Sequence, residues 1–140
     1  MSRIGDRSDV PAVQARVERG RVAAEISRQM VQLLSRYTGR GPTRARTTLN
    51  TNLAVTVFHD ALTKAELNLA AAGQTEAVHQ MRRTFQTMMR EQAIDAVEQT
   101  TGRVVLAHLS DIDPAANVAA EIFIFEPEPE DGIVGTHGHA

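Results

Sequence analysis

Two long stretches of the chain carry apolar side chains at the spacing of a helix. In the first stretch, a single apolar stripe leads up to Gly39, which is placed to end the helix because glycine readily adopts the left-handed conformation found just past helix ends. Asp9 is a good helix cap and Pro11 is tolerated in a first turn, so residues 1–9 are expected to form a flexible arm. The stripe consists of Val22, Ile26, Met30, Leu33, Leu34 and Tyr37.

The second helical stretch opens with a capping box. The Thr63 hydroxyl and the Glu66 carboxylate are spaced so that each can accept a hydrogen bond from an unpaired backbone N–H. The helix that starts there is expected to break or bend near Gly73, and a long helix follows and ends by Gly102. The long helix is predicted to point these side chains inward: Val78, Met81, Phe85, Met88, Met89, Ala93 and Val97.

Four extended segments occupy the rest of the pattern, over residues 44–50, 53–59, 103–110 and 118–126. The first segment is polar and suits the edge of a sheet, whereas the second is apolar on both faces and suits its interior. The chain therefore reads helix, hairpin, helix, hairpin. This order predicts an α+β fold, in which a four-stranded, mainly antiparallel sheet carries its helices packed on one face.

The predicted organisation is a flexible arm, a single α+β domain over residues 10–126, and an acidic, disordered tail over residues 127–140. Helices on one face leave the other face of the sheet without cover. We therefore expect the protein to form a homodimer.

Composition narrows the function classes. The chain has 140 residues, of which 42% are hydrophobic, and it has no cysteine, which excludes disulfides, thiolate metal sites and a thiol nucleophile. The sequence has neither a secretory leader nor an apolar run of the ~20 residues that a membrane helix needs, so a soluble, cytoplasmic protein is expected. The net charge is −2, yet residues 1–46 hold ten arginines against four acidic residues. This asymmetry permits either an anionic partner or contact between the two halves of the chain.

A glycine-rich turn carries the first candidate site. Its arginine and backbone N–H groups could bind a phosphate or a carboxylate, or the turn could simply end the helix. The turn consists of Gly39, Arg40, Gly41 and Pro42.

The arginines near this turn form a second candidate. Arg44 and Arg46 share one face of the edge segment, and with Arg40, Arg82 and Arg83 they could form a basic patch or remain a solvated surface. No aromatic stacking platform accompanies them, so we do not expect nucleic acid as a partner.

Histidines suggest little further chemistry. His59 and Asp60 follow the second extended segment and could perform acid–base chemistry, but no nucleophile motif accompanies them. His137 and His139 could hold a metal only loosely. We therefore expect no enzyme, no catalytic residue, no cofactor and no metal.

Two motifs give the sequence a family resemblance. The segment Tyr37–Pro42, followed by Leu62-Thr63 and Glu66, resembles the Na+-translocating membrane potential-generating system C component (MpsC) family over roughly residues 22–126. The resemblance implies a non-enzymatic accessory or regulatory protein of a system that generates membrane potential or takes up inorganic carbon. It would work at the inner face of the membrane, with an integral ion or bicarbonate transporter as its partner.

The residues expected to bind this partner or a ligand are Gly39, Arg40, Gly41, Pro42 and Arg82. The alternative is a small nucleotide- or nucleic-acid-binding regulator that uses the arginine cluster described above.

Overall fold

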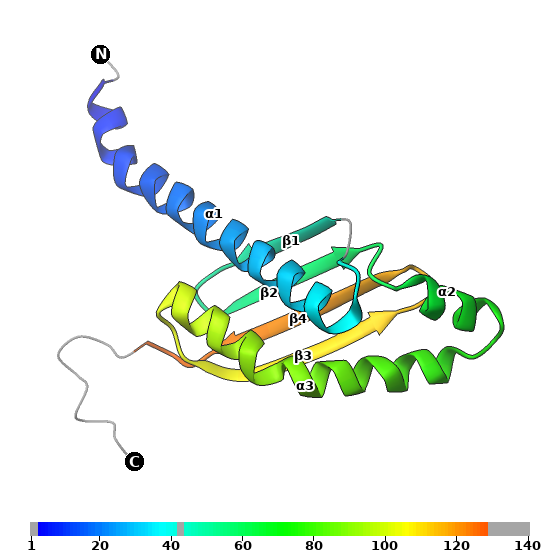
Figure 1. Cartoon of the computed structure of the whole chain (residues 1–140). Coiled ribbons are helices and arrows are strands. Elements are labelled where there is room, and N and C mark those ends of the chain that lie inside the picture. The colour runs from blue at the N-terminus through cyan, green and yellow to red at the C-terminus, as the bar shows by residue number, and fades with distance from the viewer. Residues whose placement is uncertain (1–2, 42–43, 129–140) are drawn as a thin grey trace.

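The computed structural model describes residues 3–41 and 44–128. Its elements follow the predicted order of helix, hairpin, helix, hairpin, with the second helical region divided in two (Figure 1). In chain order they are α1 (Arg3–Thr38), β1 (Arg44–Leu49), β2 (Leu53–His59), α2 (Lys64–Ala71), α3 (Thr75–Thr101), β3 (Val105–Asp113) and β4 (Val118–Phe125).

The strands form one antiparallel sheet in the order β1-β2-β4-β3. The second half of α1 and the length of α3 lie side by side across the same face of this sheet (Figure 1). The predicted α+β class and four-stranded sheet are confirmed, with β1 at an edge and β2 inside. Gly73 separates α2 from α3 with a φ of 81°, a left-handed conformation that glycine adopts at little cost.

The core lies between the sheet and the two long helices. Every second residue of β2 and β4 is buried against the helices, and Phe58 and Phe123 are fully buried. The predicted stripe of α1 supplies Ile26 and Met30 from the other side, each only 1% exposed. Burial of these large side chains is the main favourable contribution to folding.

The start of α1 differs from the prediction. The helix begins at Arg3, and Pro11 lies inside it, so the expected arm over residues 3–9 and the Asp9 cap are wrong. An internal proline removes one backbone hydrogen bond, and the helix continues when its other bonds and residues offset that loss. The amino-terminal half projects beyond the sheet (Figure 1) and leaves Val10, Val13 and Val17 largely exposed.

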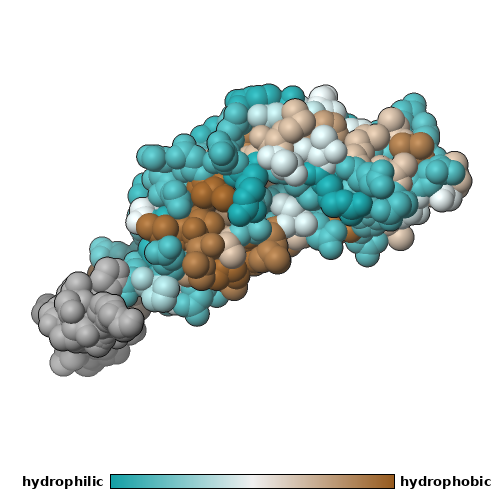
Figure 2. Space-filling view, turned by 90° about the horizontal axis from the view of Figure 1, so that it is seen from below, coloured by the Kyte–Doolittle hydropathy of each residue, from teal (hydrophilic) through white to brown (hydrophobic). Residues whose placement is uncertain are grey.

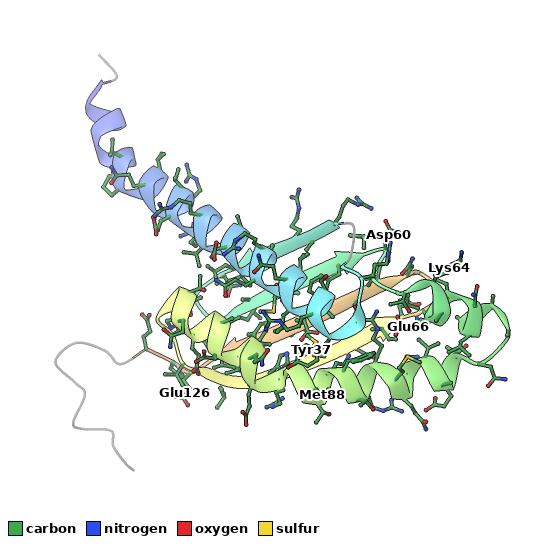
Figure 3. The ribbon with its side chains drawn as sticks, in the orientation of Figure 1. Tyr37, Asp60, Lys64, Glu66, Met88 and Glu126 are labelled. Carbon is green, nitrogen blue, oxygen red and sulfur yellow. The ribbon has the colours of Figure 1, made fainter. Side chains whose placement is uncertain are left out.

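Three further predictions need correction. Met88 is 56% exposed instead of buried, as its position in Figure 3 also shows, and Arg82 takes a buried place on the inward face of α3. Strand β3 continues to Asp113, three residues beyond its predicted end. The acidic tail lies outside the described residues from residue 129 onward.

Candidate functional site

The glycine turn after α1 positions an arginine over a neighbouring loop. Gly39 has a φ of 83° and donates its N–H to the Ser35 carbonyl at 2.9 Å, which ends the helix as predicted. The Arg40 side chain then reaches the segment after β2, where its Nη1 donates to the carbonyls of Asp60 at 3.0 Å and Leu62 at 2.9 Å. Arg40 is exposed, so it binds this loop from the solvent side.

Arg82 reaches the same loop from inside the protein. Its Nε and Nη2 each donate to one carboxylate oxygen of Glu66 at 2.8 Å, and Nη2 also donates to the Ala61 carbonyl. The two side chains are 3% and 1% exposed. This two-bond geometry is the strong form of an arginine–carboxylate pair.

Glu66 has two partners at once. It completes the predicted capping box, in which its Oε1 accepts from the Thr63 N–H at 2.8 Å and the Thr63 hydroxyl accepts from the Glu66 N–H at 3.2 Å. Burial alone would raise the pKa of Glu66. The hydrogen bonds from Arg82 and Thr63, together with the positive charge of Arg82, hold that pKa below its ordinary value, so the carboxylate stays charged.

An asparagine binds the loop from a third direction. Asn117, in the β3–β4 turn, accepts from the Leu62 N–H on its Oδ1 at 2.8 Å and from the Ala61 N–H on its carbonyl at 3.3 Å. Asp60 and Asn117 are the two non-glycine residues with positive φ, 54° and 57°, among those described. Such conformations persist where surrounding contacts over-determine them.

We call the assembly of Arg40, Glu66, Arg82 and Asn117 around residues 60–62 the arginine corner. It lies at the end of the sheet where Figure 3 labels Asp60, Lys64 and Glu66. The predicted pair, Arg40 and Arg82, therefore meets on one loop, and Arg82 is covered by protein whereas Arg40 is exposed. Pro42 lies outside the described residues.

The structure divides the expected basic patch. Arg82 is turned inward and cannot join it, while the exposed Arg83 pairs with Glu76 at 3.1 Å. Arg44 and Arg46 remain exposed on β1, where they line an open hollow of about 600 Å³ with His59. The corner and the β1 arginines are therefore separate features.

A buried polar cluster between β3 and β4 escaped the sequence prediction. Glu121 Oε1 lies 2.6 Å from His108 Nε2 and accepts from the Ser110 hydroxyl at 2.5 Å. The imidazole stacks on Phe123, with 4.6 Å between ring centroids. The sequence feature that could have revealed this cluster is Glu121, an acidic residue on the otherwise apolar face of the fourth extended segment. The Ser110 Oγ also lies 3.3 Å from His108 Nε2. Because the serine and the glutamate both approach the same imidazole nitrogen, this cluster lacks the serine–base–acid order of a nucleophilic triad, in which they bond opposite nitrogens of the ring.

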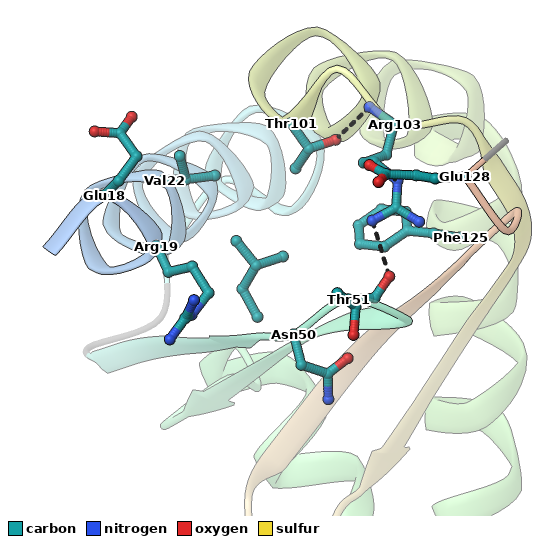
Figure 4. Close-up of a pocket in the computed structure, with 10 residues that line it drawn as sticks. Glu18, Arg19, Val22, Asn50, Thr51, Thr101, Arg103, Phe125 and Glu128 are labelled. Atoms are coloured by element: carbon teal, nitrogen blue, oxygen red, sulfur yellow. Dashed lines mark hydrogen bonds and ion pairs between the residues drawn. The ribbon is translucent and has the colours of Figure 1, made fainter. Parts of the chain in front are cut away.

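A pocket of about 240 Å³ opens between α1, the β1–β2 turn and the end of β4 (Figure 4). Arg103 closes one side: its guanidinium lies 5.0 Å from the Phe125 ring centroid, and its Nη1 donates to the Thr51 carbonyl at 2.8 Å. The volume is below the ~300 Å³ at which small-molecule sites usually begin. Within residues 3–41 and 44–128, no group of three or more acidic or histidine side chains could hold a metal ion.

Comparison with protein-family models shows which family the chain belongs to. The model of the family "Na+-translocating membrane potential-generating system (MpsC)" matches residues 18–127. The chain belongs to the MpsC family. Neither the curated proteins nor the solved structures contain a match.

The MpsC region contains the whole arginine corner and all four strands, whereas the first residues of α1 precede it. The resemblance inferred from the glycine turn and the capping box is therefore confirmed. None of the helices in the described part of the chain is long and apolar enough to span a bilayer.

Proposed function

We propose that this MpsC protein is a non-enzymatic accessory subunit of a system that generates membrane potential or takes up inorganic carbon. It acts as a homodimer in the cytoplasm, at the inner face of the membrane, and its partner is an integral ion or bicarbonate transporter. The observation that carries this proposal is the family match over residues 18–127.

The arginine corner supports a binding role. Arg40 is exposed and fixed by two carbonyl bonds, so a partner meets a side chain whose conformational entropy is already reduced. Arg82 and Glu66 hold the loop beneath it without reaching the surface. We assign Arg40 to the contact with the partner, Gly39, Gly41 and Pro42 to the shape of the turn, and Arg82 to the positioning of the loop.

A crosslinked pull-down from the protein's own host tests the proposal. Tagged wild-type chain, crosslinked before the membranes are solubilised, is expected to recover an integral ion or bicarbonate transporter. Arg40→Lys keeps the charge but loses the planar guanidinium, so recovery should fall at least threefold. Arg36→Lys is the matched control, because Arg36 is an exposed arginine near the same helix end that bonds Gln92 instead.

Two outcomes of the pull-down would contradict parts of this proposal. Recovery of the chain alone, or of nucleic-acid machinery, would contradict the accessory role and favour the alternative, a small nucleotide- or nucleic-acid-binding regulator that uses the arginine cluster. Equal recovery by wild type and Arg40→Lys would remove Arg40 from the contact.

A further inference from the structure

One face of the sheet is free of helices in the described chain. Both long helices lie on the other face, as Figure 1 shows. Alternation along the strands places the remaining side chains of β2 and β4 on this open face, and all of them are apolar except His59. The apolar members of the open face are Leu53, Val55, Val57, Ala107, Leu109, Val118, Ala120, Ile122 and Ile124.

This apolar surface reaches solvent. Leu109 is 54% exposed, and Leu106, at the irregularity in β3, is 61% exposed. Figure 2 shows hydrophobic residues gathered in a patch beside the end of the described chain. A contiguous apolar patch on a protein surface marks an interaction site.

Charges at the two edges of the open face indicate what covers it. The pairing register places Arg44 in the same row as Asp113, and Arg46 in the same row as Asp111. The arginines are on edge strand β1 and the aspartates on edge strand β3, with apolar side chains of β2 and β4 between them. All four are exposed, and no ion pair among the described residues includes any of them.

This arrangement of charges is complementary to the same face of a second copy. A two-fold axis that runs parallel to the strands, midway between β2 and β4, places β1 of one copy over β3 of the other. Residues that share one row across the sheet stay at the same level along the strands after this rotation. Arg44 then faces Asp113 of the other copy, and Arg46 faces Asp111. An axis across the strands would instead put the basic edge over itself, so the charges select the first arrangement.

We infer that a second copy of this chain docks face to face on the open sheet, with the basic β1 edge of each copy against the acidic β3 edge of the other. The inference deepens the homodimer of the proposed function and gives its geometry.

The size of the sheet is consistent with this partner. The four strands span roughly 19 by 23 Å, from about 4.8 Å between strands and about 3.3 Å per residue. With the relief of the side chains, two such faces bury on the order of 1,000 Å², the lower bound for a specific interface. Aligned packing of two sheets, with mean strand directions within about 30° of each other, is a common way to cover such faces.

Analytical ultracentrifugation of the full chain tests the arrangement. The wild type is expected to be a dimer at micromolar concentration. Arg46→Glu and Asp111→Arg should each weaken dimerisation at least tenfold, because each creates two like-charge contacts across the axis. The double variant Arg46→Glu/Asp111→Arg restores opposite charges and should recover most of the affinity. Arg16→Glu makes the same charge change on the exposed part of α1 and should have no effect.

Leu109→Glu provides a second test that does not depend on the edges. Leu109 is already more than half exposed, so the variant should fold, which circular dichroism checks, yet be monomeric. A monomeric wild type would overturn the inference, as would a dimer unaffected by these variants. If residues 129–140 covered the face instead, Leu109→Glu would not change the mass. These assays use purified protein and test only the dimer, whereas the pull-down tests the transporter partner. Either inference can therefore be contradicted while the other is supported.

Discussion

Replacing Arg82 with methionine tests the arginine corner most severely. The substitution removes three hydrogen bonds from a site where Glu66 is 1% exposed. It leaves the Glu66 carboxylate without its counter-charge and the Ala61 carbonyl without the Arg82 donor. Breaking a buried ion pair from one side costs about 3–5 kcal/mol. With a urea slope of about 1.5 kcal/mol per molar, the unfolding midpoint should fall by ~2–3 M.

The pH dependence of this loss identifies its cause. In the wild type the pKa of Glu66 is lowered, so the stabilisation it gives is present above the unfolded-state pKa of about 4.3 and is lost as the pH falls through the folded-state value. Burial is the largest influence on the pKa of Glu66, and without Arg82 only the Thr63 hydrogen bonds oppose it. The pKa of Glu66 is therefore expected to rise in the variant, and its charged carboxylate destabilises the folded state most at neutral pH. The gap between wild type and Arg82→Met should therefore narrow as the pH falls to 4.

Urea unfolding at one fixed protein concentration, at pH 7 and pH 4, measures both effects. Adding Glu66→Gln to Arg82→Met removes the buried charge and should recover at least ~1 kcal/mol at pH 7. Arg83→Met, next in sequence but exposed, should change stability by less than ~0.5 kcal/mol. A loss below about 1 kcal/mol for Arg82→Met, or an equal loss at both pH values, would refute the reasoning.

Three further substitutions test neighbouring parts of the fold by urea or thermal unfolding. Asn117→Ala removes the acceptor of the Leu62 N–H and forces alanine to a φ of 57°, so a loss of about 2–3 kcal/mol is expected, and Asn117→Gly should lose less. Glu121→Leu leaves His108 without its buried partner and should cost about 2 kcal/mol. Gly102→Ala meets no neighbouring atom but has a φ of 72°, so a loss of about 1 kcal/mol, or ~4 °C in Tm, is expected.

The parts of the fold that depend on local sequence were predictable. The capping box of Thr63 and Glu66 joins groups three residues apart, and the sequence contains all of it. Gly39 and Gly73 mark breaks for the same reason, since their positive φ is a local requirement. The period of the apolar residues likewise located the inward stripe of α1 and the apolar strands β2 and β4, whereas β1 is polar.

The parts that depend on distant residues were not predictable from these signals. Arg82 looks like a surface residue until Glu66, 16 positions away, supplies a buried counter-charge. Its place four residues after the buried Val78 and seven before the buried Met89 was the available clue. Arg40 follows α1, but the loop it binds follows β2, so no local pattern joins the two. The start of α1 could not be predicted from Pro11, because proline is tolerated in a first turn and, at a cost in stability, also within a helix.

Membrane potential in living cells tests the proposed function most directly. A strain that lacks this gene should show a lowered potential by a voltage-sensitive dye, and the wild-type gene should restore it. Arg40→Lys, expressed at the same level and with the same melting temperature, should restore it only in part, whereas Arg36→Lys should restore it fully. A potential unchanged by the deletion, under conditions in which the protein is made, would contradict the accessory role.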